Sequence, residues 1–177
     1  MNTYESAELG RRIIRGEMAF NGVYAADTFI ETLDFRNQST LAYIVNTEQS
    51  SSHGRHWVAI IQEPGDMFEF FDPLGHGPWH YANLNIFNSV AFNSHSLLNP
   101  RTNTSAHACL LYLYFRSHGY LFQFVLEWFR TLFIDFGSLT NGVLVIITAL
   151  KLHYCIPVHA LEQLYENIQS SVAPYVN

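Results

Sequence analysis

The sequence predicts one α+β domain over residues 1–177, with a central, antiparallel-rich sheet packed by helices. Its 177 residues are a suitable length for one domain, and no linker divides them. Short apolar segments rich in β-branched and aromatic residues lie in the first half, whereas longer segments typical of helices lie in the second. With 49% apolar residues, the chain can bury a sizeable core, which argues against a disordered or coiled-coil protein.

The first half predicts a helix, a turn and then strands. Tyr4 to Arg15 is typical of a short polar helix that stops at Gly16, and Phe20 to Val23 (Phe-Asn-Gly-Val) is typical of a turn. Three strands follow, at Leu41–Asn46, His56–Ile61 and Met67–Phe71. A polar, serine-rich loop separates the first two strands, and the turn Glu63–Asp66 joins the last two as an antiparallel hairpin. A weaker strand signal lies at Ser89–Phe92.

The second half predicts helices. Asn103, Thr104 and Ser105 are typical of a helix start, and the apolar residues that follow, Ala106–Phe115, end at Gly119. A second helix is expected over Tyr120–Phe133, broken near Gly137, and a terminal helix over Pro157–Ser170. The segment Val143–Leu152 is compatible with either a strand or a helix.

Composition excludes several classes of function. The net charge of −6 and the scattered basic residues argue against a nucleic-acid partner. The longest uncharged stretch, Phe136–Leu150, is shorter than the ~20 residues that cross a bilayer, so we expect no membrane partner. Two cysteines exclude a disulfide framework, although not a single bridge, and favour an intracellular, reducing compartment. His76 and His80 flank Gly-Pro without an evident third ligand, so we expect no metal and no cofactor.

His56 and Asp72 are the candidate catalytic pair. In an antiparallel hairpin, the start of one strand lies beside the end of its neighbour, so these two side chains can meet at one edge of the sheet. A carboxylate beside an imidazole fixes its tautomer and raises its basicity. The spacing is also compatible with a surface histidine near a turn, because Asp-Pro commonly begins turns.

Three segments of the sequence resemble the adenovirus-type cysteine protease family, which includes proteases of Polinton/Maverick transposons and related DNA viruses. They are Ile44–Thr47, His56–Ala59 and Phe70–Gly75, in the family's order. The resemblance covers the region from Phe20 to Tyr120 and implies a papain-like fold with the nucleophile at the start of a central helix. It implies that His56 is the general base, that Asp72 orients it, and that Trp57 packs beside the pair.

The nucleophile position departs from the family's pattern, which places Cys-Gly at the start of the central helix and a glutamine several residues upstream. This region of the chain reads Ser105-Ala-His-Ala-Cys109. In one register, Cys109 is the nucleophile and Asn103 replaces the glutamine. The thiol would then lie more than one turn inside the helix, where backbone N–H groups are already paired and the helix dipole has little effect.

In the other register, Ser105 occupies the nucleophile position, Ala106 replaces the glycine, and Leu98 stands where the glutamine would be. Cys109 then matches a second cysteine that many relatives carry four residues later. We prefer this register because it places Ser105 at the helix cap. A serine hydroxyl hardly ionises near neutral pH, and losing an oxyanion-hole side chain costs about 3–4 kcal/mol, so we expect little or no turnover.

The resemblance therefore implies a catalytically degenerate protease of a DNA virus or transposon, reused as a virion-structural or binding module. Its partner would be a peptide or capsid precursor of the same virus or element, in the host nucleus or cytoplasm and in the virion. The alternative is an active thiol endopeptidase that processes capsid precursors with Cys109, or with a cysteine that has been replaced at position 105. Adenovirus-type enzymes can be stimulated by DNA and a capsid peptide, but the acidic charge argues against DNA here.

Overall fold

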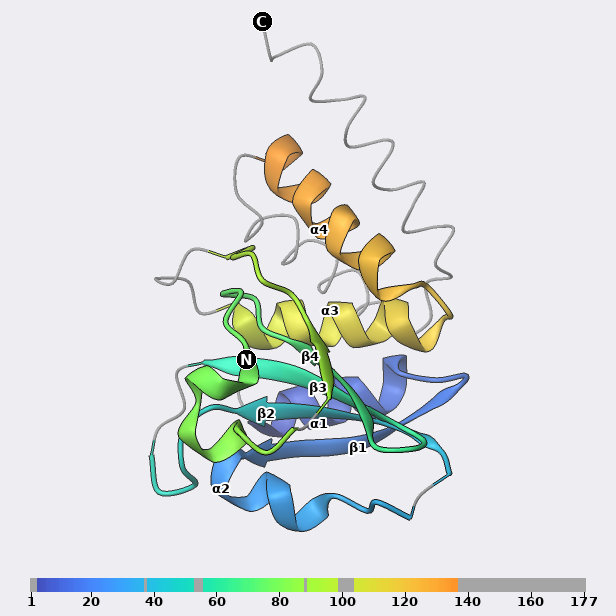
Figure 1. Ribbon diagram of the computed structural model, residues 1–177. Coiled ribbons are helices and arrows are strands. Elements are labelled where there is room, and N and C mark those ends of the chain that lie inside the picture. Colours follow the sequence, from blue (N-terminus) through green and yellow to red (C-terminus); the bar gives the residue numbers. More distant parts are fainter. Residues whose placement is uncertain (1–2, 37, 53–55, 88, 99–103, 137–177) are drawn as a thin grey trace, which may run out of the picture.

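The structure is a computed structural model that describes residues 3–36, 38–52, 56–87, 89–98 and 104–136 (Figure 1). Its strands are β1 (Met18–Ala25), β2 (Thr40–Asn46), β3 (Trp57–Glu63), β4 (Met67–Phe71) and β5 (Val90–Phe92). Its helices are α1 (Thr3–Ile13), α2 (Ala26–Phe29), α3 (Ser105–Ser117) and α4 (Phe122–Phe136), with short 3₁₀ segments η1 (Ile30–Thr32), η2 (Pro78–His80) and η3 (Ala82–Leu84). The fold is α+β, and the predicted segments 143–152 and 157–170 lie outside the described residues.

The five strands form one mixed sheet in the order β1-β2-β3-β4-β5. β2, β3 and β4 pair antiparallel, so the predicted hairpin is confirmed. β1 pairs parallel with β2, and β4 pairs parallel with β5. The expectation of an antiparallel-rich sheet is therefore wrong at both edges. Each edge strand is joined to its neighbour by a crossover with short helical segments, which parallel pairing requires.

The predicted turn at Phe20–Val23 is also wrong, because these residues continue β1. The pairing register with β2 shifts between Phe20 and Gly22, and Gly22 adopts a φ of 135°. A bulge of this kind absorbs an extra residue without ending the strand, and a glycine accepts the unusual φ. The Asn-Gly pair therefore produces an irregularity in an edge strand rather than a chain reversal.

Both faces of the sheet are buried. Alternate residues of β3 face opposite sides, as the period of a strand requires. Trp57, Ala59 and Ile61 join a core with α1, α3 and α4, whereas Val58 and Ile60 join a second core with α2 and η3. Because β3 is covered on both sides, its sequence is a continuous apolar run rather than an alternating one.

The central helix is α3, which packs on the sheet beside α1 and separates the sheet from α4 (Figure 1). Nearly all of its residues are buried, which explains why its sequence is apolar around the whole helix. The predicted end at Gly119 is confirmed, since α3 ends at Ser117 and Gly119 adopts a left-handed φ of 83°. No helix in the described part of the chain combines the length and hydropathy needed to cross a bilayer.

Candidate active site

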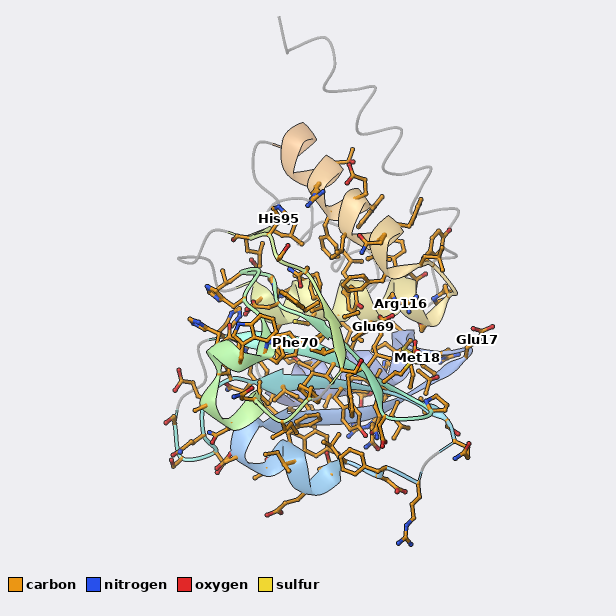
Figure 2. The ribbon with its side chains drawn as sticks, in the orientation of Figure 1. Glu17, Met18, Glu69, Phe70, His95 and Arg116 are labelled. Atoms are coloured by element: carbon orange, nitrogen blue, oxygen red, sulfur yellow. The ribbon has the colours of Figure 1, made fainter. Side chains whose placement is uncertain are left out.

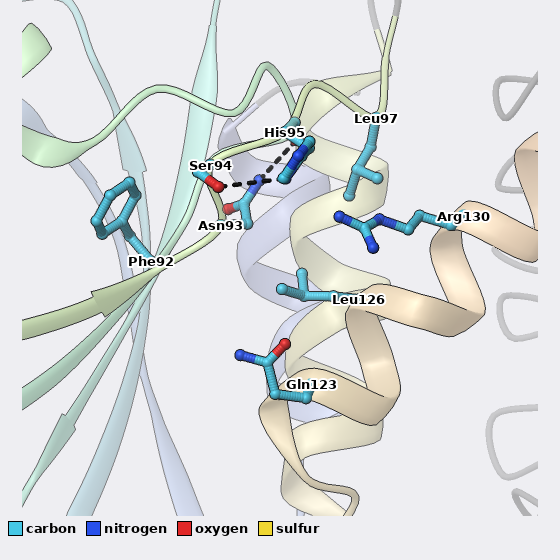
Figure 3. Close-up of a pocket in the computed structure, with 8 residues that line it drawn as sticks. All are labelled: Phe92, Asn93, Ser94, His95, Leu97, Gln123, Leu126 and Arg130. Carbon is cyan, nitrogen blue, oxygen red and sulfur yellow. Dashed lines mark hydrogen bonds between the residues drawn. The ribbon is translucent and has the colours of Figure 1, made fainter.

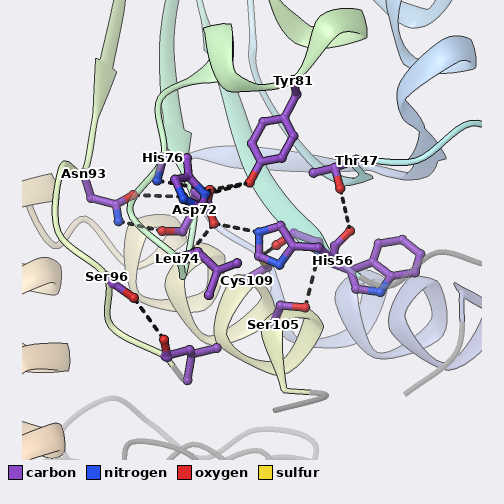
Figure 4. Close-up of polar contacts among 12 residues, drawn as sticks. Thr47, His56, Asp72, Leu74, His76, Tyr81, Asn93, Ser96, Ser105 and Cys109 are labelled. Carbon is purple, nitrogen blue, oxygen red and sulfur yellow. Dashed lines mark hydrogen bonds and ion pairs between the residues drawn. The ribbon is translucent and has the colours of Figure 1, made fainter. Parts of the chain in front are cut away.

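Three predicted site residues come together at one end of the sheet (Figure 4). His56 immediately precedes β3, Asp72 immediately follows β4, and Ser105 begins α3. His56 Nε2 lies 2.7 Å from Asp72 Oδ1, which confirms that the two side chains meet at the edge of the hairpin. The backbone N–H of Trp57 donates a 3.3 Å hydrogen bond to Ser105 Oγ, so the hydroxyl lies against the peptide that follows His56.

The imidazole of His56 bonds to the carboxylate of Asp72, and the N–H of the next residue, Trp57, bonds to the hydroxyl of Ser105. Figure 4 shows its second ring nitrogen, Nδ1, on the side of the ring that faces Ser105. The side chain is only 16% exposed. Its backbone carbonyl accepts a 3.1 Å hydrogen bond from the N–H of Thr47, the residue that follows β2. The end of β2 therefore fixes the position from which the imidazole projects.

Asp72 is completely buried, and its carboxylate accepts several hydrogen bonds. Besides His56, the donors are the Leu74 N–H at 2.7 Å, the Tyr81 hydroxyl at 2.6 Å and the His76 N–H at 3.2 Å. Burial raises the pKa of Asp72, but the hydrogen bonds and the His56 charge lower it by more, so its pKa lies below the usual value. The carboxylate is therefore ionised at neutral pH and can orient the imidazole.

Two residues that the sequence analysis did not single out hold Asp72 in place. Tyr81 is one of the side-chain donors to Asp72, and its ring stacks against that of His56 with centroids 6.1 Å apart. Asn93 bonds the backbone of Asp72 twice, accepting from its N–H at 2.8 Å and donating to its carbonyl at 2.6 Å. Both residues lie in irregular segments, so no periodicity in the sequence points to them.

Ser105 is the first helical residue of α3 rather than its cap, which corrects the sequence expectation. The N-cap residue is Thr104. The Ser105 hydroxyl accepts from Trp57 of β3 and so links the helix to the sheet. Ser105 is 3% exposed, and the neighbouring Ala106 is buried in the core beneath it. The hydroxyl nevertheless lies at the N-terminal end of a helix, where unpaired backbone N–H groups favour negative charge.

Cys109 lies one turn further along the same helix face and is fully buried. Its thiol donates a 3.3 Å hydrogen bond to the Trp57 carbonyl. Burial raises the pKa of Cys109 well above its usual value, and the charge of Asp72 raises it further. A thiol in this environment stays protonated and is a poor nucleophile. Of Ser105 and Cys109, only Ser105 lies at the N-terminus of α3.

The remaining predicted residues of the cleft fall into two groups. Trp57 and Leu98 are buried in the same core as α3, and the Leu98 N–H donates to the Pro73 carbonyl at 2.9 Å. Leu98 therefore presents no side-chain donor where the resemblance would place a glutamine. Asn103, which replaces that glutamine in the other register, lies outside the described residues.

His76 and His80 stack on one another with ring centroids 4.1 Å apart, beside the Asp72 carboxylate. His76 Nδ1 lies 3.3 Å from Asp72 Oδ2, and the side chain of His76 is 41% exposed. Among the residues that the structure describes, no three histidine, cysteine or acidic side chains are arranged to hold a metal ion. These histidines therefore contribute polar surface next to the buried carboxylate.

Replacing Gly75 by alanine is expected to destabilise the turn that carries Asp72. Gly75 has a φ of +77°, and a Cβ there would clash with the backbone of His95 and Ser96. Gly65 provides a matched control, because its φ is +81° but nothing lies within 4 Å of an added Cβ. Both alanine variants pay the left-handed strain, so we expect Gly75→Ala to lose about 1–2 kcal/mol more in urea unfolding because of the clash. Equal losses would contradict this packing.

No protein-family model matches the sequence, and no curated protein matches it. Among solved structures, the central domain of the uncharacterized Lpg1148 protein from Legionella pneumophila is similar, with a TM-score of 0.54 and 16% sequence identity. The match covers 85% of this chain and 97% of that chain. At this identity the likeness shows the fold alone, and it says nothing about chemistry.

Proposed function

We propose that this chain is a degenerate relative of the adenovirus-type cysteine proteases, with a papain-like fold, that binds a peptide instead of cleaving it. The observation that carries the proposal is the hydrogen-bonded His56–Asp72 pair beside Ser105 at the start of α3. A base, an orienting acid and the N-terminus of a helix are the parts that a thiol protease needs. Position 105 carries a hydroxyl in place of the sulfur of a cysteine.

Three features of the site support weak or absent turnover. A serine hydroxyl needs full proton removal by His56, whereas a thiol ionises readily. Ser105 Oγ already accepts a hydrogen bond from the Trp57 N–H, and Ser105 is a buried residue. Leu98 offers no side-chain donor to an oxyanion, and the loss of one such donor costs about 3–4 kcal/mol.

The partner that fits this proposal is a peptide or capsid precursor of the same virus or element, in the host nucleus or cytoplasm and in the virion. The alternative function, an active thiol endopeptidase with Cys109 as nucleophile, is less well supported. The Cys109 thiol is completely buried and bonded to a backbone carbonyl. Reaction at this sulfur would require α3 to move away from β3.

The variant Ser105→Cys tests whether the site still activates a nucleophile. We expect the new thiol to react with iodoacetamide at pH 7 about tenfold faster than an unperturbed thiol, because His56 and the helix terminus stabilise its thiolate. The measurement is the labelling rate at each cysteine, followed by peptide mass spectrometry. Ser39→Cys supplies the reference, because Ser39 is exposed just before β2 and has no histidine among its neighbours in the sequence.

A second substitution, His56→Ala, separates activation from access. Removing the imidazole makes more room in the site. If access alone controlled the labelling rate, Ser105→Cys/His56→Ala would react faster than Ser105→Cys. We expect the opposite, a slower reaction, because the base is lost. The proposal is overturned if Ser105→Cys reacts no faster than Ser39→Cys, or if His56→Ala leaves the labelling rate of Ser105→Cys unchanged. Specific, Ser105-dependent cleavage of a precursor peptide by the unaltered protein would contradict the proposal that the protein binds a peptide without cleaving it.

A further inference from the structure

A cavity lies next to the segment that bonds to the backbone of Asp72. It has a volume of about 150 Å³ and is bounded by the segment that follows β5 on one side and by α4 on the other (Figure 3). Leu97 and Leu126 form apolar parts of its wall. Figure 3 shows the Arg130 guanidinium extending from α4 toward the segment that contains His95. Neither His56 nor Ser105 lines the cavity.

Each polar side chain that lines this cavity can donate a hydrogen bond. Arg130 contributes a guanidinium, Gln123 an amide, Ser94 a hydroxyl and His95 an imidazole. Among the described residues, no carboxylate lines the cavity, although the whole chain carries a net charge of −6. A guanidinium presents a planar fork of N–H groups that matches the paired oxygens of a carboxylate or phosphate. This donor set therefore suits an oxyanion.

Arg130 already has a partner that an anion can replace. Its Nη1 lies 3.3 Å from Glu127 Oε2 on the surface of α4, and the two side chains are 46% and 70% exposed. An ion pair that is this exposed contributes little to stability, because water screens it and both side chains lose freedom. Arg130 can therefore leave Glu127 for a ligand in the cavity at little cost in free energy.

One wall of the cavity is the segment that holds the Asp72 turn. The Asn93 side-chain amide donates to the carbonyls of both Asp72, at 2.6 Å, and His95, at 3.2 Å. The Leu97 N–H donates to the Pro73 carbonyl at 2.8 Å. A group bound against His95 and Leu97 would therefore contact the same backbone that positions the acid of the candidate active site.

We propose that this cavity is an oxyanion-binding site, for a phosphate or a carboxylate group, with Arg130 as its principal ligand. The proposal is independent of the proposed function, because it depends only on the donors of α4 and of the segment after β5. Occupancy of the site would be transmitted to Asp72 through Asn93.

The test is a titration of the full chain with inorganic phosphate, and separately with acetate, at constant ionic strength set by chloride. Nitrogen-15 NMR would follow the Arg130 Nε–H and Asn93 side-chain signals. We expect saturable shifts of both signals, and tighter binding of one probe identifies the group as phosphate or carboxylate. If neither probe shifts these signals in a saturable way, the proposal is overturned.

Arg130→Gln and Arg11→Gln form a matched pair of variants. Arg11 is also exposed and also pairs with a glutamate three residues earlier, Glu8, at 3.8 Å, but it lies on α1 away from the cavity. We expect Arg130→Gln to weaken binding by about tenfold, the factor for losing one hydrogen bond to a charged group, and Arg11→Gln to leave it unchanged. Equal weakening by both variants would show a general charge effect and would overturn the assignment to this cavity.

Discussion

Replacing Arg116 by methionine is expected to lower the free energy of unfolding by about 3–5 kcal/mol, because it leaves a nearly buried carboxylate without its cation. Arg116 of α3 lies against Glu69 of β4 (Figure 2), and each side chain is only 12% exposed. Arg116 Nε donates to Glu69 Oε2 at 2.8 Å, and the Tyr112 hydroxyl donates to the same oxygen at 2.7 Å. This network joins the central helix to the sheet at the end of α3 opposite to Ser105.

Urea unfolding at pH 7 measures the loss. Arg11→Met is the control, because Arg11 is 62% exposed and its replacement is expected to change stability by less than about 1 kcal/mol. The double variant Glu69→Leu/Arg116→Met removes both charges and is expected to be more stable than Arg116→Met alone. A double variant as unstable as the sum of the two single variants would show that the two residues act separately.

The hairpin of β3 and β4 could be predicted from the sequence, and with it the meeting of His56 and Asp72. Its two apolar runs and its four-residue turn are local features, and antiparallel geometry then places the two side chains at one edge. The parallel edges of the sheet could not be predicted in this way. The parallel pairing of β1 and β5 depends on contacts between segments that are distant in the sequence. The residues at the bulge near Gly22 also resemble a turn in the sequence, so β1 could not be identified there.

The ambiguity between Ser105 and Cys109 has a simple geometric origin. Residues four apart lie on the same face of a helix, so both side chains face the backbone of Trp57. Ser105 accepts from its N–H, and Cys109 donates to its carbonyl. Spacing alone cannot separate two such residues, whereas their positions in α3 do, because only Ser105 lies at the helix terminus. Tyr81 and Asn93 escaped prediction because their role depends entirely on tertiary contacts with Asp72.

Replacing Asp72 by asparagine is expected to destabilise the protein by about 3–4 kcal/mol at pH 7, because it weakens several hydrogen bonds to a buried charged group. One carboxylate oxygen would become an NH₂ group, which cannot accept a hydrogen bond. At the Oδ1 position it would lose the Leu74 N–H, and at the Oδ2 position it would lose both the His76 N–H and the Tyr81 hydroxyl. The loss should depend on pH. Because the pKa of Asp72 is lower in the folded state, its charge stabilises the fold fully above its unfolded pKa. That stabilisation disappears as the pH falls through the folded pKa.

The difference in unfolding free energy between the unaltered protein and Asp72→Asn should therefore be largest near neutral pH and shrink below about pH 4, where aspartate begins to be protonated in the unfolded chain. Urea unfolding at a series of pH values measures this difference directly. Asp66→Asn is the matched control, because Asp66 is exposed in the turn between β3 and β4, and asparagine tolerates its φ of 59°. A loss for Asp72→Asn that stays constant down to pH 3 would mean that packing, and not the buried charge, holds this end of the sheet together. The imidazole of His56 would then lack the ionised partner on which its proposed role depends.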